Sequence, residues 1–240
     1  MFGGAFIYIY RIQTNRMNGK ICLIAVWFCA SILLEPLSAA YIIYHLQVYP
    51  DPRLLHDLMF EILPYWPWVY NYYSTVMLAV IALPCLYLAY KDKDFRYNIF
   101  VTIGTVFLFR DLSIVITNLP LTLHDLNDPK CINYSMLSFN NILKHTYFGY
   151  ECADYFFSGH MLFYTLGFIA MYKIFKKYIL IIMIPWFISC MLALLIARIH
   201  YSIDIVHSVF ITTMVYNFVT PLMIKKLDEI FGEIDPGEIV

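Results

Sequence analysis

The sequence predicts an all-α protein, an integral membrane bundle of six transmembrane helices with both termini on the cytoplasmic side. Apolar residues make up 61% of the 240 residues and charged residues only 14%, a composition far from that of a soluble domain. Six apolar stretches approach the roughly 20 residues that a helix needs to cross a bilayer. The distribution of Lys and Arg between these stretches supplies the orientation.

The six predicted spans form one helical bundle with a short segment at each end. Residues 1–20 are predicted as a cytoplasmic N-terminal segment, 21–224 as the transmembrane domain and 225–240 as a cytoplasmic acidic tail. The first apolar run is too long for the core of a signal peptide, so we expect it to be retained. The predicted spans are 21–46, 68–90, 97–118, 155–172, 178–197 and 203–224.

Basic residues flanking the spans favour one orientation, because Lys and Arg are held on the cytoplasmic side. One face of a six-span bundle has eleven of them and the opposite face only four. The eleven are Arg11, Arg16, Lys20, Lys91, Lys93, Arg96, Lys173, Lys176, Lys177, Lys225 and Lys226. The loops before the second, fourth and sixth spans are therefore predicted to be exoplasmic, and so is any site built on them.

The predicted loop before the fourth span carries features typical of a secretory lumen. Asn133 begins the N-glycosylation sequon Asn133-Tyr134-Ser135, which is used only in such a compartment. Cys131 and Cys152 bracket this loop and could form a disulfide there. No Cys-x-x-Cys or His-Glu-x-x-His spacing predicts a metal site, and no basic stripe suggests nucleic acid as a partner.

Two short polar segments lie near the starts of the fourth and sixth spans, and each contains a histidine. His200 and Asp204 are i and i+4, so on a helix the carboxylate would hold one ring nitrogen and leave the other free to act. His160, preceded by Ser158 and Gly159, supplies the second proton-handling group that a displacement at phosphorus requires. The alternative is a polar cluster that only ties helix ends together.

Neighbouring polar residues suggest how a phosphate could be held. Ser158 and Gly159 are expected to contact phosphate oxygens, the hydroxyl as donor and the glycine by admitting close backbone approach. Arg110 lies inside the third span, where a charge is costly unless it is paired or faces a site. It either steadies the phosphate or forms a buried pair with another helix. Glu35 is expected to be structural, whereas His207 could join the relay or line the site.

These segments resemble the signature motifs of the sphingomyelin synthase family, part of the lipid phosphatase and phosphotransferase superfamily. The resemblance includes residues 152–160 and 200–206, extends to Phe109-Arg110-Asp111, and reaches Leu55-His56-Asp57 in a weakened form. Type 2 phosphatidic acid phosphatases have Pro where this chain has Phe157, which favours a transferase over a phosphatase. Arg198 and His207 are not residues that the family pattern leads us to expect at their positions.

The resemblance implies an enzyme that moves phosphocholine or phosphoethanolamine from a glycerophospholipid to ceramide. His200, held in one tautomer by Asp204, would attack phosphorus and form a phosphohistidine, while His160 acts first as acid and then as base. The implied substrate contacts are Ser158, Gly159, Arg110, Asp154 and Tyr201. The products would be sphingomyelin or a relative and diacylglycerol.

The resemblance implies no cofactor, and lipids are the expected partners. An inositol phosphoceramide synthase, a lipid phosphate phosphatase and a non-catalytic lipid-binding relative are the alternatives. The expected location is the Golgi or plasma membrane if the chain is eukaryotic, or the inner membrane if it is bacterial. The sequence leaves open a homo-oligomer and the choice of head group.

Overall fold

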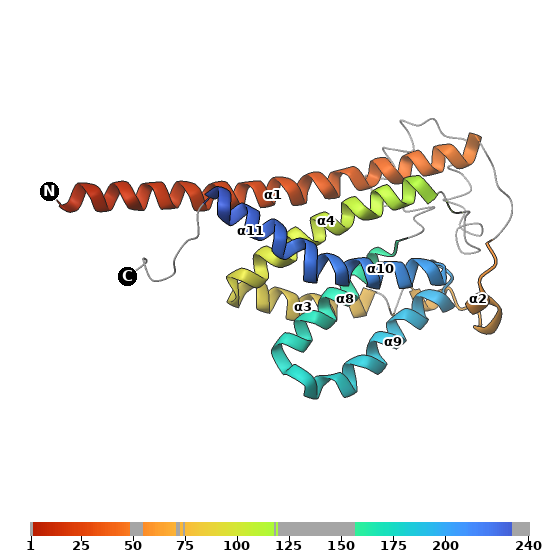
Figure 1. The fold of residues 1–240 in the computed structure, drawn as a ribbon. Helices are drawn as coiled ribbons and strands as arrows, with labels where there is room; N and C mark the ends of the chain where they lie inside the picture. The colour runs from red at the N-terminus through yellow and green to blue at the C-terminus, as the bar shows by residue number, and fades with distance from the viewer. Residues whose placement is uncertain are drawn as a thin grey trace.

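All regular structure in the described part of the chain is helical (Figure 1). The computed structural model describes residues 2–48, 55–70, 73, 75–117, 119 and 157–231. Its helices are α1 (Phe2–Val48), α2 (Leu58–Ile62), α3 (Thr75–Lys91), α4 (Lys93–Thr117), α8 (Gly159–Phe175), α9 (Leu180–Ile196), α10 (Ser202–Met214) and α11 (Thr220–Phe231). A 3-10 turn at Lys176–Ile179 precedes α9, and a π-helical turn at Val215–Val219 joins α10 to α11.

Within the described residues, three helical segments are long and apolar enough to cross a membrane. They are Asn18–Tyr41 within α1, the whole of α4, and the continuous run Ser202–Phe231, while α3 and α9 are apolar but shorter. A helix lies in each of the six predicted spans, which confirms the all-α prediction for the described residues. The crossing of a membrane by all six helices and the orientation of the termini stay predictions.

The helix starts differ from the predicted spans because local hydrogen bonds set them. α8 begins at Gly159 because Ser158 has an extended backbone (φ −84°, ψ 112°) and its Oγ accepts the Met161 N–H at 3.3 Å, as an N-cap does. In the second predicted span, α3 begins at Thr75, and the described residues 68–70 and 73 before it are also helical, in agreement with the predicted start at residue 68. α1 already begins at Phe2, so the predicted N-terminal segment and the first span form one helix.

α4 is the central helix that joins α1 to α11. The Trp27 indole N–H of α1 donates to Thr105 Oγ1 at 3.3 Å. About one turn earlier on α4, the Thr102 hydroxyl lies 2.8 Å from that of Thr220 in α11. Gly104 permits the close approach of α1, because a Cβ there would lie 2.9 Å from Trp27 Cδ1. These contacts fix the position of α4, whose later turns carry Arg110.

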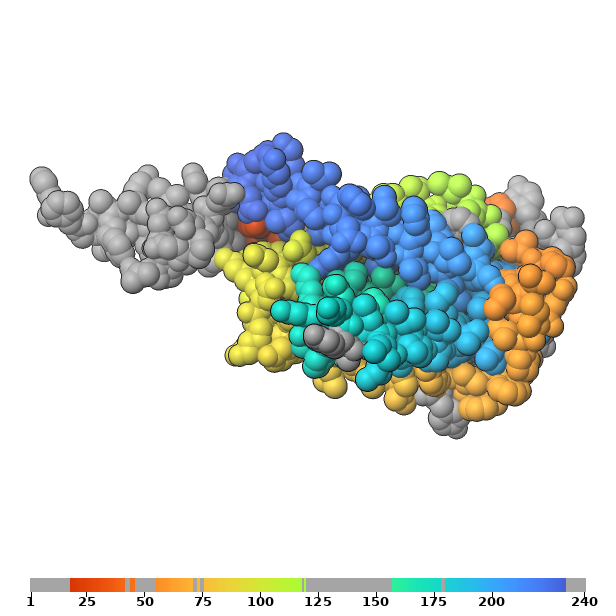
Figure 2. Space-filling view, turned by 60° about the horizontal axis from the view of Figure 1, so that its bottom comes forward, coloured from red at the N-terminus to blue at the C-terminus, as the bar shows by residue number. Residues whose placement is uncertain are grey.

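α8 packs between α3 and α10 and brings His160 to the end of the bundle. Its inward residues Leu162 and Leu166 join Phe157 in one buried apolar cluster. Figure 2 shows α8 and α9 on the facing surface and the orange residues 55–70 covering one end of the molecule. Hydrophobic packing therefore continues to the first turn of α8, where the polar segments begin.

Candidate active site

The two motif histidines come from separate elements and face each other. His160 lies in the first turn of α8, and His200 lies in the connection between α9 and α10. Their ring centroids are 6.2 Å apart with the ring planes 64° to each other. The His200 residue is only 5% exposed. The structure thus brings together the two imidazoles that the sequence placed forty residues apart.

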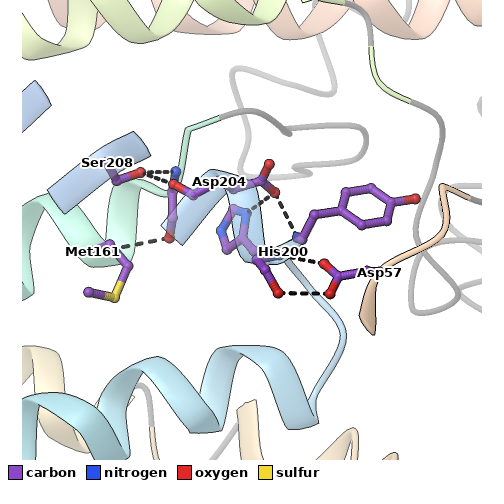
Figure 3. Close-up of polar contacts among 8 residues, drawn as sticks. Asp57, Met161, His200, Asp204 and Ser208 are labelled. Carbon is purple, nitrogen blue, oxygen red and sulfur yellow. Dashed lines mark hydrogen bonds and ion pairs between the residues drawn. The ribbon is translucent and has the colours of Figure 1, made fainter. Parts of the chain in front are cut away.

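The Asp204 carboxylate lies near His200, but the local backbone that places it there differs from the predicted helix. His200 is not in a helix, because α10 begins after the N-cap residue Tyr201 (φ −75°, ψ 158°). The Asp204 carboxylate folds back over this helix start, and its Oδ2 accepts the Tyr201 N–H at 2.8 Å. The same oxygen lies 3.4 Å from His200 Nδ1 (Figure 3). The predicted i, i+4 pairing is present, but helix capping rather than a shared helical face produces it.

The His200–Asp204 separation is longer than a hydrogen bond, which for N–H···O spans about 2.7–3.2 Å. Catalytic contacts are often long without substrate and tighten in the complex. Asp204 is fully buried, so its carboxylate meets little competition from water. With Nδ1 turned toward Asp204, the Nε2 nitrogen of His200 is the one available to a substrate.

Ser208 connects the two histidine-bearing segments, and sequence reasoning missed it. Its hydroxyl donates to the Asp204 carbonyl at 2.5 Å and accepts the Ser158 N–H at 2.6 Å (Figure 3). All three residues are fully buried. The start of α8 is therefore tied to the first turn of α10. The available signal was the i, i+4 spacing of Asp204 and Ser208, which suits a serine bonding back to the preceding turn.

Ser158 and Gly159, the two predicted phosphate contacts, have different surroundings in the structure. Ser158 Oγ caps α8, and the residue is 0% exposed, so contact of this hydroxyl with phosphate stays a prediction. Among the described residues, the atom that a Cβ at Gly159 would meet within 4 Å is the Arg110 Nε, at 4.0 Å. Packing of the described residues therefore does not require a glycine at this position, and the predicted contact of Gly159 with phosphate stays a prediction.

Of the two roles predicted for Arg110, the buried pair is present in the structure and the phosphate contact stays a prediction. The residue is 2% exposed, and its Nη1 lies 2.5 Å from Glu35 Oε1 of α1. The next residue of α4, Asp111, accepts from Ser38 Oγ at 2.9 Å. The buried interhelical pair is thus confirmed, with Glu35 as the partner. Because Arg110 also borders Gly159, its cationic group lies beside the first turn of α8.

We expect Gly159→Ala and Gly167→Ala to affect the protein in different ways. A Cβ at Gly167 would lie 2.1 Å from Ile81 Cγ2, and such overpacking costs about 1–3 kcal/mol. Gly159→Ala should leave stability unchanged or raise it by up to about 1 kcal/mol, yet lower transfer about 10-fold or more by crowding the phosphate. Thermal unfolding in detergent and a transfer assay test both variants; unchanged activity in Gly159→Ala would contradict the phosphate contact.

Removing Glu35 should destabilise the protein. In Glu35→Ala the buried Arg110 guanidinium loses a carboxylate partner, and breaking such a pair costs about 3 kcal/mol or more. The 21% exposure of the Glu35 side chain places the expected cost at the lower end. Glu35→Gln keeps an acceptor oxygen and should lose less. Thermal unfolding of the two variants provides the measurement, and equal stability of wild type and Glu35→Ala would show that the pair contributes nothing.

Aromatic rings surround the two histidines and the connection that carries His200. Tyr70 meets the edge of the His160 ring at 5.4 Å between centroids. Tyr201 is 1% exposed and packs on Phe60 at 5.4 Å, so its predicted substrate contact stays a prediction. His207 packs on Phe157 at 5.9 Å, which agrees with a lining role.

Several predicted residues lie outside the described residues. They are Asp154 as a substrate contact, Cys131 and Cys152 as a disulfide, and Asn133 as a glycosylation site. Within the described ranges, no group of three His, Cys, Asp or Glu residues could hold a metal ion. The expectation that the reaction needs no cofactor stays a prediction.

Comparison with known proteins places these residues in a recognised region. Residues 151–221, which include both motif histidines and Asp204, match the family described as PAP2 superfamily C-terminal. The chain is 29% identical over 140 residues to human phosphatidylcholine:ceramide cholinephosphotransferase 2, covering 53% of this chain and 38% of that protein. It is 26% identical over 196 residues to Caenorhabditis elegans sphingomyelin synthase-related 1, covering 75% of this chain and 40% of that protein. No solved structure matches.

Proposed function

We propose that the chain, a sphingomyelin synthase-like member of the lipid phosphatase superfamily, transfers a phosphorylated head group from a glycerophospholipid to ceramide. The head group is phosphocholine or phosphoethanolamine, and the second product is diacylglycerol. The observation that carries the proposal is the proximity of the His160 and His200 rings, whose centroids are 6.2 Å apart, with the buried Asp204 carboxylate next to His200.

The first step makes a phosphohistidine. His200 Nε2 attacks phosphorus, an N–P bond forms, and the bond to the diacylglycerol oxygen breaks with its electron pair on that oxygen. Protonated His160 gives this oxygen its proton. Asp204 stabilises the positive charge that develops on the His200 ring and holds its Nδ1 proton, as the carboxylate does in other nucleophile–base arrangements.

The second step reverses the proton transfer with a new alcohol. His160, now neutral, takes the proton from the primary hydroxyl of ceramide as the oxygen attacks phosphorus. The N–P bond breaks, and its electron pair returns to His200. One histidine thus serves the phosphorus and the other serves the two alcohols, so that the enzyme is regenerated without a further reactant.

The geometry supports this division of labour. Reacting atoms approach to about 3–3.5 Å before attack, and a general acid lies about 2.6–3.2 Å from the oxygen that it protonates. Two imidazoles that act on one phosphoester must therefore lie near each other, as these two do, with ring centroids 6.2 Å apart. Arg110, beside Gly159, supplies a positive charge for the phosphate at the same place.

The test is a product assay with the purified protein in liposomes. Fluorescent ceramide is offered with phosphatidylcholine, phosphatidylethanolamine or phosphatidylinositol as donor, and lipids are separated by chromatography. A labelled phosphosphingolipid identifies the transferase and its donor, including an inositol phosphoceramide synthase. Release of a phosphorylated head group or inorganic phosphate without labelled product would indicate a phosphatase-type hydrolase, and no product from any donor would overturn the proposal in favour of a non-catalytic relative.

A further inference from the structure

The connection between α9 and α10, which carries His200, is covered by a segment more than a hundred residues earlier in the chain. This segment, residues 57–66, consists of α2 and its two flanks. In Figure 2 its orange atoms lie against the light-blue atoms at the junction of α9 and α10. We use the name 57–66 clamp for it, because its polar contacts fall on both helix ends that flank His200.

At one end of the clamp, the Asp57 carboxylate caps two helices. Its Oδ2 accepts the backbone N–H of Ser202 at 2.6 Å, and its Oδ1 accepts the Ser202 hydroxyl at 2.7 Å (Figure 3). Oδ1 also accepts the Met59 N–H at 2.9 Å, so the same side chain is the N-cap of α2. Ser202 is the first residue of α10, whose N–H groups need such an acceptor. The cap lies two residues from His200.

At the other end, the clamp holds the C-terminus of α9. The Trp66 N–H donates to the carbonyl of Ile196, the last residue of α9, at 3.0 Å. Arg198 Nη2 donates to the Phe60 carbonyl at 2.8 Å. The Arg198 guanidinium also lies 5.4 Å and 5.3 Å from the ring centroids of Phe60 and Tyr65, a cation–π distance.

The connection needs this support because its backbone is not in a relaxed conformation. Arg198 has φ 54°, a left-handed conformation that costs a residue with a side chain about 1 kcal/mol or more. Such conformations persist only where the surroundings hold them. The clamp provides contacts to Arg198 itself and to residues on both sides of it, and thereby holds the connection that carries His200.

We propose that Asp57 is a positioning residue for the reaction. By capping α10 it fixes Tyr201 and the first turn, and thereby the Asp204 carboxylate beneath His200. The inference rests on the proposed function for its kinetic consequence, but the placement of His200 can be measured without activity. The hydrogen bonds described for the Asp57 carboxylate are to Met59 and Ser202 and not to either motif histidine, so its effect is on geometry rather than on the chemistry of either step.

Asp57→Ala is compared with Asp92→Ala as a matched control. Asp92 is also a capping carboxylate, since its Oδ1 accepts the Asp94 and Phe95 N–H groups at 2.9 and 3.0 Å at the start of α4. Asp92→Ala loses the cap of one helix and Asp57→Ala the caps of two, so both melting temperatures should fall, and that of Asp57→Ala by more. We expect kcat to fall about 10- to 100-fold in Asp57→Ala, with KM nearly unchanged, and to stay close to wild type in Asp92→Ala.

Two conservative variants make the test sharper. Asp57→Asn keeps an oxygen for the Ser202 N–H and should retain more activity than Asp57→Ala. Ser202→Ala removes only the hydroxyl contact and should have the smallest effect of the three. Equal losses of kcat in Asp57→Ala and Asp92→Ala would overturn the inference, because the loss would then follow from general destabilisation.

A second readout does not depend on activity. Diethylpyrocarbonate modifies histidine nitrogens, and peptide mass spectrometry quantifies the rate at each residue. His200 should react slowly in wild type and several-fold faster in Asp57→Ala, with no change in Asp92→Ala. If wild type transfers no head group, the proposed function fails while this labelling still tests the clamp. An unchanged rate at His200 in Asp57→Ala would refute the positioning role.

Discussion

His200→Ala is expected to lower kcat for head-group transfer by about 10⁴-fold or more, as removal of a covalent nucleophile does elsewhere. The cause is the loss of the nitrogen that forms the bond to phosphorus, which no neighbouring group replaces. Wild type incubated with a donor labelled in its head-group phosphate should retain acid-labile, base-stable label on the protein after quenching. The variant should retain none, while its melting temperature stays near that of wild type.

The control for this experiment is His207→Ala. His207 lies on α10 and packs against Phe157, so its removal changes the histidine content near the site without touching the proposed nucleophile. We expect the label and most of the transfer activity to persist in this variant. Acid-labile label on His200→Ala would remove the nucleophile assignment, and loss of label in His207→Ala would place that residue in the relay.

The sequence was sufficient to predict the helices because a membrane setting leaves the backbone few alternatives to helix. Apolar length located all six predicted helices, but it could not locate their ends. α8 begins where Ser158 can cap it, and α10 begins after Tyr201 because the Asp204 carboxylate folds back onto that residue. Such ends depend on single hydrogen bonds. A hydropathy pattern, which averages over many residues, does not resolve them.

In the candidate site, too, the sequence predicted some features and not others. Motif spacing predicted that His160, His200 and Asp204 belong together, and the structure brings them to one place. Partners from distant segments were not predictable: Glu35 pairs with Arg110 across 75 positions, and Asp57 with Ser202 across 145. These pairs follow from how α1 and α2 pack on the rest of the bundle. A single sequence contains no periodic signal for that packing.

His160→Ala is expected to lower transfer from a natural glycerophospholipid by about 10²–10⁴-fold, the usual contribution of a positioned acid or base. The diacylglycerol oxygen is a poor leaving group and needs the proton that His160 supplies. A donor whose leaving group departs without a proton tests whether His160 acts as the acid in the first step. With p-nitrophenyl phosphocholine, the nitrophenolate departs as an anion, so the first step should proceed in His160→Ala at a rate much closer to that of wild type.

The second step in His160→Ala should still be impaired, because the ceramide hydroxyl lacks its base. We therefore expect a burst of nitrophenolate that approaches one equivalent of enzyme, followed by slow turnover, with label accumulating on His200. Stopped-flow absorbance measures the burst, and His200→Ala provides the burst-free reference. No burst in His160→Ala would mean that this histidine is needed to bind or orient the phosphate, and equal steady-state rates in wild type and His160→Ala with ceramide would rule it out as the base.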